Sequence, residues 1–470
     1  MNVHCFLKGP KGHRMLLDLS DGQPFELEEM QFNVIKHFNG RHSINELAKI
    51  FGLGEENILN FAKELKRNNL VVFDKRKALH SRNLSIDTEV RVPYLYEVHL
   101  DITSACNLKC KHCYQFPYLY GNESRKDIET EEILNLIDQM HDLNASKLVI
   151  SGGEPFLRPD IVKIIKYAIS KGIFISAIFT NGTVVNDKLL EFIAKEAWPS
   201  MIIAVSLDGD SPIIHDRLRG NGAFNKTIRF IKLLSSLQKK GAKYKYVINT
   251  IVTRMNQNRF FKMMSFLKGL GIEWWRIALP REQGLYVLNK EELEVNTDRF
   301  LPVYKSFISK YISDYKKDPE SVISNVQVES FFKTNMLREK KLNIFKLSDP
   351  CCKYKRNAIT IKPNGDVTAC TGFNNLVLGN IRSTPLRNIW YSRKTQSLKA
   401  LPIYKIKECA ECDLYNFCGG GCRIIAFDKT RSIYRKDEVA CTKFKFFKDE
   451  ILPIYEKEKF KFLPSRDVII

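Results

Sequence analysis

Three cysteines in one short run, Cys106, Cys110 and Cys113, offer the strongest signal for chemistry in this sequence. Thiolates are soft ligands that suit iron–sulfur clusters, and three of them can hold a four-iron cluster while one iron stays open. A zinc knuckle is the alternative, but structural zinc prefers paired thiolates and a complete set of four ligands. No fourth ligand follows the run at knuckle spacing. The spacing therefore favours an iron–sulfur cluster with one reactive iron.

The residues around this cysteine run predict strands that lead into it. Residues 94–102 alternate between apolar and polar side chains and predict a strand that ends just before the cysteines. The next predicted strand, Lys147–Ile150, runs into Gly152, Gly153 and Glu154. Glycines let a backbone approach a ligand closely, and a carboxylate can bind an ammonium group. We expect both segments at the carboxyl ends of strands, where α/β barrels keep their active sites.

Further strands and helices alternate along the middle of the chain. The predicted strands are Ile173–Phe179, Met201–Val205, Tyr244–Val252 and Ile272–Leu279. The predicted amphipathic helices are Thr130–Leu143, Pro159–Lys171, Asn186–Lys195 and Phe224–Lys240. Such alternation is typical of a parallel sheet with right-handed crossovers. We therefore predict an α/β fold in which residues 94–290 form a partial (β/α)6 barrel.

A second group of cysteines lies beyond residue 350. The spacing of seven of them is the second strong signal, and an eighth, Cys351, precedes the first: Cys352, Cys370, Cys409, Cys412, Cys418, Cys422 and Cys441. No signal-peptide pattern opens the sequence, so we expect a cytoplasmic, reducing location that disfavours disulfides. Cys5 lies in an apolar segment and is predicted to be a buried structural thiol.

Together these motifs resemble the radical S-adenosylmethionine (SAM) enzymes that carry a SPASM extension. The resemblance implies that the open iron of the Cys106–Cys113 cluster chelates SAM, whose cleavage yields a 5′-deoxyadenosyl radical that abstracts hydrogen. It implies three [4Fe–4S] clusters, one that binds SAM and two that are auxiliary. It also implies a flavodoxin- or ferredoxin-type reductant as a partner.

The same resemblance implies roles for single residues. The segment Gly152–Glu154 would hold the SAM amino group, and Ser206 best matches a position that contacts the SAM carboxylate or ribose. Weaker candidates for those contacts are Asn181, Asn249 and Arg219. Asn181 could instead only cap a turn, and Arg219 could only pair with Asp216. No catalytic residue is identified by this reasoning.

The resemblance also implies how the later cysteines are shared between the auxiliary clusters. One cluster would be held by Cys409, Cys412, Cys418 and Cys441. The other would be held by Cys352, Cys370 and Cys422. Cys351 could complete this second set, or it could be a bystander that leaves an iron open for a substrate thiolate. The sequence leaves both alternatives open.

The first ninety residues predict a separate unit of short strands and three helices. The predicted strands are Val3–Leu7, Met15–Leu19 and Leu70–Phe73, and the predicted helices are Leu27–Phe38, Ile44–Phe51 and Glu55–Asn68. This pattern resembles the PqqD-like winged-helix element that recognises leader peptides. Winged helices also bind DNA, but Glu55 and Glu56 in the first turn of the third helix would face phosphate with the wrong charge.

Composition agrees with a multi-domain enzyme. The chain has 470 residues, of which 44% are hydrophobic, more than a single core holds. We predict domains at residues 1–90 (leader recognition), 91–325 (radical SAM) and 326–470 (SPASM). No apolar run approaches the ~20 residues that span a bilayer, so no membrane partner is expected. The formal charge of +21 attracts polyanions or an acidic peptide, or it serves solubility.

The sequence therefore predicts an enzyme that crosslinks a ribosomally made precursor peptide, bound through its leader. A Cys thioether of the sactipeptide or ranthipeptide type is the preferred product. The alternatives are a carbon–carbon crosslink and maturation of pyrroloquinoline quinone or mycofactocin. Anaerobic sulfatase maturation is disfavoured because Thr371 follows Cys370 where that group carries Asp. A nucleic-acid-binding redox protein is also disfavoured.

Overall fold

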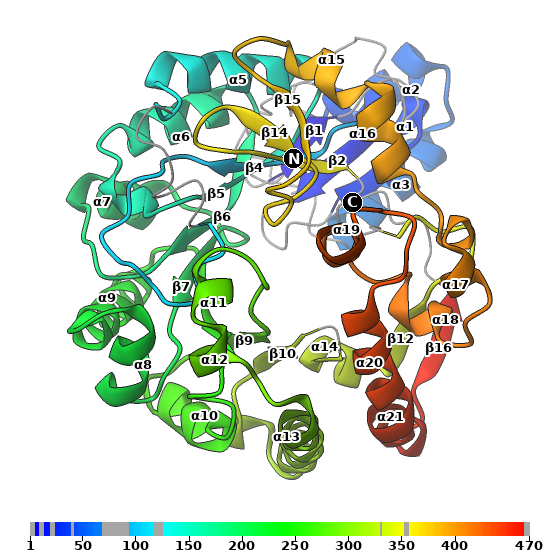
Figure 1. Ribbon diagram of the computed structural model, residues 1–470. Coiled ribbons are helices and arrows are strands. Elements are labelled where there is room, and N and C mark those ends of the chain that lie inside the picture. The colour runs from blue at the N-terminus through cyan, green and yellow to red at the C-terminus, as the bar shows by residue number, and fades with distance from the viewer. Residues whose placement is uncertain are drawn as a thin grey trace.

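A computed structural model of the chain describes most of its residues. The described residues are 5–8, 14–18, 24–38, 42–67, 94–115, 126–329, 331–351 and 357–464. They bury apolar side chains in one large core and in smaller separate clusters within the first 67 residues. Figure 1 shows a large curved sheet with helices along its outer side. No helix among the described residues is long and apolar enough to cross a membrane.

The N-terminal residues form a small antiparallel sheet followed by three helices. The strands are β1 (Cys5–Lys8), β2 (Arg14–Asp18) and β3 (Pro24–Leu27), with β2 in the middle. The helices are α1 (Glu29–Lys36), α2 (Ile44–Phe51) and α3 (Glu55–Arg67). The strand β3 was not predicted. Leu27 ends this strand instead of starting a helix, because Glu28 caps α1 through a capping box with Gln31. Residues 70–73 and the side chain of Cys5 lie outside the described part.

All six strands that the sequence predicts between residues 94 and 290 are present and parallel. They are β4 (Glu97–Asp101), β5 (Lys147–Ser151), β6 (Phe174–Thr180), β7 (Ile202–Ser206), β8 (Lys245–Ile251) and β9 (Trp274–Ala278). They lie in chain order across the sheet. The four predicted helices are observed as α5 (Thr130–Asp142), α6 (Ile161–Ser170), α7 (Asp187–Glu196) and α9 (Ala223–Lys239). Period and length were therefore enough to find these elements.

The sheet is wider than predicted. β10 (Asn325–Val328) pairs in parallel with β9, and β13 (Ala358–Ile361) pairs in parallel with β4. Antiparallel strands continue both edges: β11 (Phe332–Lys333), β14 (Asp366–Thr368) and β15 (Val377–Asn380). The result is a sheet of 11 strands whose described pairings do not close into a ring. The prediction of six strands was incomplete because local periodicity does not tell which distant segments pair at an edge.

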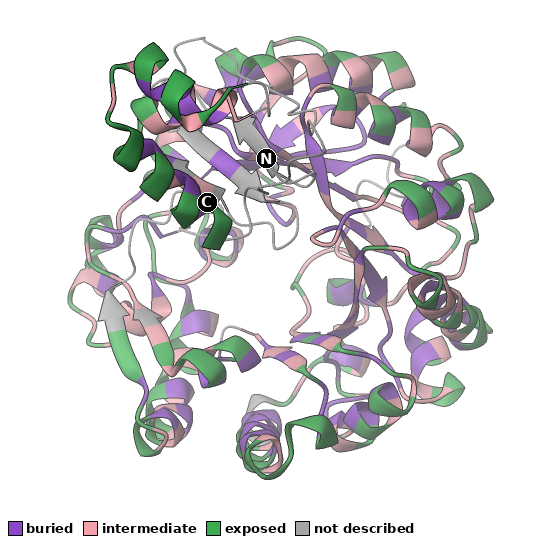
Figure 2. Ribbon diagram, turned by 180° about the vertical axis from the view of Figure 1, so that it is seen from behind, coloured by how far each residue is buried: buried purple, intermediate pink, exposed green. Residues whose placement is uncertain are grey.

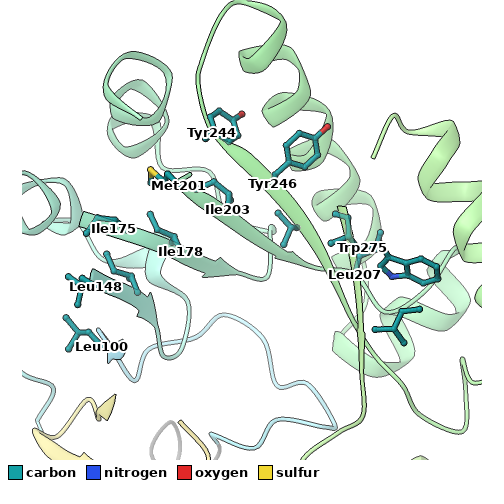
Figure 3. Close-up of a cluster of buried hydrophobic side chains, with 14 of the residues drawn as sticks. Leu100, Leu148, Ile175, Ile178, Met201, Ile203, Leu207, Tyr244, Tyr246 and Trp275 are labelled. Carbon is teal, nitrogen blue, oxygen red and sulfur yellow. The ribbon is translucent and has the colours of Figure 1, made fainter. Parts of the chain in front are cut away.

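The core lies between one face of this sheet and the helices. Leu100, Leu148, Ile203 and Trp275 all project toward that side from neighbouring strands (Figure 3). Figure 2 shows the buried colour along the strands and the exposed colour on the outer sides of the helices. Because side chains alternate along a strand, the residues between these apolar ones occupy the opposite face of the sheet.

The remaining helices and strands complete the large part of the molecule. The helices beside the sheet are α8 (Pro212–Arg219), α10 (Phe260–Gly269), α11 (Leu285–Leu288), α12 (Lys290–Leu293), α13 (Thr297–Lys317) and α14 (Thr334–Glu339). The last 130 or so residues contain β12 (Lys341–Ile344), α15 (Leu386–Trp390), α16 (Arg393–Lys399), α17 (Lys407–Ala410), α18 (Tyr415–Cys418), α19 (Arg423–Thr430), α20 (Glu438–Phe446), α21 (Leu452–Lys457) and β16 (Lys461–Pro464). Five of the later cysteines lie in or beside the helices α17, α18, α19 and α20: Cys409, Cys412, Cys418, Cys422 and Cys441. Cys370 instead follows β14. Such short helices are held by packing more than by their own length.

Candidate cysteine-rich site

The first cysteine loop, residues 102–113, follows β4 and packs directly against the segment after β5. The backbone N–H of Gly153 donates to Thr103 O, and that of Glu154 donates to Ala105 O, each at 2.8 Å. A Cβ on Gly153 would lie 2.2 Å from Ala105 O, and one on Gly152 would lie 2.6 Å from Thr103 O. Both contacts are too short for any side chain. The close approach expected of the two glycines is therefore made to the cysteine loop itself.

Glu154 is fully buried next to this loop. Its carboxylate accepts hydrogen bonds from Phe156 N (3.1 Å), Thr180 Oγ1 (2.8 Å) and Asn181 N (2.7 Å). Burial nevertheless raises the pKa of Glu154 to about 7, and the hydrogen bonds only oppose that rise. A cation at this position would favour the ionised carboxylate.

The side chain of Asn181 caps a turn and also contacts the cysteine loop. Its Oδ1 accepts from the backbone N–H of Thr183 at 2.8 Å, which is the turn-capping role. Its Nδ2 donates to Asn107 Oδ1 at 3.0 Å, and Asn107 belongs to the cysteine loop. A further hydrogen bond from Asn181 helps to lower the pKa of Cys106, which burial raises. Asn181 therefore supports the loop as well as the turn.

Arg219 does not pair with Asp216, which was the alternative that the sequence left open. Its Nε donates to Asp208 Oδ2 at 2.6 Å, and its Nη1 lies 3.8 Å from the Sγ of Cys110. Its Nη2 lies 3.3 Å from His112 Nε2. The carboxylate of Asp216 instead accepts two backbone N–H groups that follow α8. The sequence offered no signal for this pairing because Arg219 and Asp208 lie on different elements.

These contacts give the cysteine loop a charged and buried support. Burial raises the pKa of Cys110 to about 12, the charge of Arg219 opposes the rise, and the neighbouring Cys113 and Cys106 add to it. Burial also lowers the pKa of His112 to about 4. The Nδ1 of His112 finds no hydrogen-bond partner within the described residues. Arg219 is thus a fixed cation beside a thiol that needs one to ionise.

The three loop thiols converge, which suits a cluster. The charges of Cys106 and Cys113 both act on Cys110. No three His, Cys, Asp or Glu side chains in the described ranges are arranged to hold a single metal ion. A four-iron cluster binds each thiol through a different iron and so takes ligands that lie farther apart than those of one ion. The three thiols are soft donors of the kind that an iron–sulfur cluster takes, so the residues present fit such a cluster.

Ser206 and Asn249 lie side by side at the carboxyl ends of β7 and β8. Ser206 pairs with Asn249, Asn249 with Arg276 on β9, and Arg276 with Gln327 on β10. We call these four residues the polar row. Paired residues project from the same face, here the one opposite the core. The four residues predicted to contact SAM therefore lie in two places. Ser206 and Asn249 belong to the polar row, whereas Asn181 and Arg219 contact the cysteine loop.

The described later cysteines form two groups. The thiols of Cys409, Cys412, Cys418 and Cys441 act on one another, and burial raises the pKa of Cys418 to about 12. Cys351 lies beside Cys409 in the same apolar cluster. The second group contains Cys370 and Cys422, close to Arg281. Cys352 lies outside the described residues.

The segment after the first cysteine loop meets the segment after Cys370. The guanidinium of Arg281 lies 5.0 Å from the ring centroid of Tyr114 and its Nη2 donates to Thr371 Oγ1 at 3.2 Å. Arg281 also interacts with Cys370 and Cys422. Tyr114 comes directly after Cys113 and Thr371 directly after Cys370. Sequence reasoning missed Arg281 because nothing in its surroundings indicates a role.

The matches to known families agree with this arrangement. Residues 100–267 match the radical SAM superfamily, and residues 351–413 match SPASM, an iron–sulfur cluster-binding domain. The chain therefore carries a radical SAM domain followed by a SPASM domain, and the protein is a radical SAM enzyme.

Two relatives and one solved structure show how far the likeness extends. The AdoMet-dependent heme synthase of Oleidesulfovibrio alaskensis is 27% identical over 366 residues, which are 73% of this chain and 86% of that protein. The antilisterial bacteriocin subtilosin biosynthesis protein AlbA of Bacillus subtilis is 23% identical over 427 residues, 86% of each chain. The structure of Streptococcus suis SuiB bound to the precursor peptide SuiA matches with a TM-score of 0.63 at 18% identity. It covers 94% of this chain and 99% of SuiB, and the two share a fold.

Proposed function

We propose that this enzyme crosslinks a ribosomally made precursor peptide and forms a Cys thioether. The observation that carries the proposal is the junction of Tyr114, Arg281 and Thr371. This junction connects the first cysteine loop, the proposed site of the SAM-binding cluster, to the thiols of Cys370 and Cys422. A crosslink with net loss of two hydrogens needs both hydrogen abstraction and an electron acceptor, and this junction brings the proposed sites for the two together.

We assign the groups that this chemistry needs to the cysteines. Cys106, Cys110 and Cys113 would hold the SAM-binding [4Fe–4S] cluster. The two auxiliary clusters would be held by Cys409, Cys412, Cys418 and Cys441 and by Cys352, Cys370 and Cys422. When bound, these groups and SAM supply a 5′-deoxyadenosyl radical and an electron acceptor. The reducing electron would come from a flavodoxin- or ferredoxin-type partner.

The remaining predicted residues would bind and orient SAM. The buried carboxylate of Glu154 would receive its ammonium group. The hydroxyl of Ser206 and the amide of Asn249 are side by side and would contact its carboxylate or ribose. Asn181 and Arg219 would position the cysteine loop, because their polar groups are already bonded within the protein.

We propose that the N-terminal unit, residues 1–90, is a PqqD-like leader-binding domain. The radical SAM domain would then span residues 91–325 and the SPASM domain residues 326–470. An extended leader would add a strand to the small sheet. β2 already pairs on both sides, so the leader would add beside β1 or β3. The exposed Glu55 and Glu56 at the start of α3 oppose a nucleic acid in this place.

A reaction like that of the AdoMet-dependent heme synthase is the second candidate, because that relative covers 73% of this chain. Mass spectrometry separates the two. The reconstituted enzyme is incubated with SAM, a reductant and the peptide encoded by a neighbouring short gene, and the product is then alkylated. A thioether predicts the loss of two hydrogens together with one thiol that no longer reacts. An unchanged peptide alongside turnover of a porphyrin precursor would reverse the ranking.

A further inference from the structure

The polar row continues into an unassigned pair of cations. Gln327 pairs in parallel with Arg276 on β9 and antiparallel with Lys333 on β11. Residues paired in this way project from one face of the sheet. Trp275 and Ile277, the neighbours of Arg276 along β9, are buried in the core on the other face. Arg276 and Lys333 therefore flank Gln327 on the face that the outer helices leave open.

Among the described residues, the two cations have no ion-pair partner. Both side chains are exposed to solvent. Neither forms an ion pair with a carboxylate in the part of the chain that the structure describes. Lys333 is accessible, yet desolvation by the surrounding protein and the charge of Arg276 both lower its pKa. Like charges on β9 and β11, on either side of Gln327, repel each other, and an anion between them would remove that repulsion.

We propose that Arg276 and Lys333 bind a carboxylate side chain, Asp or Glu, of the peptide substrate. The guanidinium of Arg276 can take a carboxylate through two N–H groups, and the ammonium of Lys333 adds a point charge. The formal charge of +21 favours an acidic peptide over a neutral one. The assignment rests on the proposed peptide-modifying function and adds a recognition element to it.

SAM also carries a carboxylate, but the sheet places the pair far from its proposed amino group. Glu154 follows β5, whereas Lys333 lies on β11, six places along the sheet order. Neighbouring strands lie ~4.8 Å apart along a sheet. The amino and carboxylate groups of SAM share one carbon atom, so they cannot occupy sites separated in this way. A substrate that extends along the polar row can reach both regions.

The test measures how fast Lys333 is acetylated in the reconstituted full-length enzyme. Two synthetic peptides serve as probes, acetyl-Gly-Glu-Gly-Glu-amide and the same peptide with Gln in place of Glu, and SAM is a third probe. The Glu peptide should slow acetylation of Lys333 by about threefold or more, because it holds the ammonium in an ion pair. The Gln peptide and SAM should leave the rate unchanged. Exposed Lys317, at the end of α13, is the reference lysine.

Arg276→Met should abolish the protection, and the matched variant Arg338→Met, on α14, should retain it. Protection by SAM would assign the carboxylate to the cofactor and overturn the proposal. Equal protection by both peptides, or by neither, would also overturn it. The readout needs no turnover. A protected Lys333 in an enzyme that leaves every precursor unchanged would contradict the proposed crosslinking alone.

Discussion

Lys362 and Asp101 form an ion pair in which Nζ lies 3.1 Å from Oδ2 and neither side chain is exposed to solvent. Asp101 ends β4, directly before the first cysteine loop. Lys362 also donates to Gln115 Oε1 at 3.0 Å, after that loop, and to the carbonyl of Thr371 at 2.8 Å. One buried ammonium therefore holds both ends of the cysteine loop against the segment that follows Cys370.

Replacing this lysine should destabilise the protein strongly. Lys362→Met leaves Asp101 buried without its cation, and breaking a buried pair in this way costs about 3–5 kcal/mol. Chemical denaturation followed by circular dichroism measures the loss. The matched control is Lys163→Met, which removes an exposed pair with Glu131 at 3.0 Å and should cost at most about 1 kcal/mol. Equal effects of the two variants would contradict the assigned role of the buried pair.

Arg219 should set the reduction potential of the cluster proposed at the first cysteine loop. Removing a cation that lies 3.8 Å from Cys110 Sγ disfavours the reduced, more negative cluster. We therefore expect a more negative midpoint potential in Arg219→Met, measured by redox titration with electron paramagnetic resonance. Arg217→Met, on the same helix but exposed and paired with Glu292, should leave the potential unchanged. A shift in Arg217→Met as large as in Arg219→Met would show that the effect is not local.

SAM affinity should depend on pH through Glu154. Burial raises the pKa of Glu154 from 4.5 to about 7, so between those values the folded protein holds a proton that the unfolded chain has lost. The contribution of this proton to folding stability is complete at low pH, and it is lost as the pH rises through the range between the two pKa values. The population of ionised Glu154, the form that would bind the SAM ammonium, increases as the pH rises. Affinity should rise about tenfold from about pH 6 to about pH 8, measured by equilibrium dialysis.

Two variants check this assignment. Glu154→Gln should remove the pH dependence, since it cannot ionise. Thr180→Val should move the dependence to higher pH, because the hydroxyl of Thr180 donates to the Glu154 carboxylate and favours its ionised form. A wild-type affinity that stays constant across this range would refute a role of the carboxylate in binding SAM.

The first cysteine loop can be tested by iron content. Replacing Cys106, Cys110 and Cys113 together with Ala should abolish reductive SAM cleavage and leave the auxiliary iron in place. Iron analysis after anaerobic reconstitution should give about twelve irons in the wild type and about eight in the variant, if each site holds four. Unchanged formation of 5′-deoxyadenosine in the variant would end the assignment.

The elements of the central sheet could be predicted because each has a local signature. β4 and β5 are short apolar strands that lead into chemically distinctive loops, and every cysteine in those loops is visible from spacing alone. The N-terminal helices also lie close to their predicted bounds. The start of α2, for example, is marked by the capping box that Ser43 and Glu46 form. Local pattern therefore located the scaffold and the loops that carry the cysteines.

The supporting contacts could not be predicted in the same way. Arg219 chooses Asp208 over the nearer Asp216 because the fold buries Asp208 beside Cys110. Lys362 directly follows β13, whose parallel neighbour β4 lies far earlier in the chain. Such pairs depend on three-dimensional proximity, and one sequence carries no periodic signal for them. The charged partners of the cysteine loop were therefore missed while the cysteines themselves were found.

The pairing of β4 with β13 has a consequence for how the enzyme is made. Lys362 and Asp101 are separated by 261 positions in the chain. During synthesis β4 leaves the ribosome long before β13, so one of its edges stays unpaired while more than half of the protein is still being translated. The anchor that holds both ends of the first cysteine loop forms only after that delay. Loading of the cluster proposed at this loop would therefore follow translation of the β13 region, and one edge of β4 stays open until then.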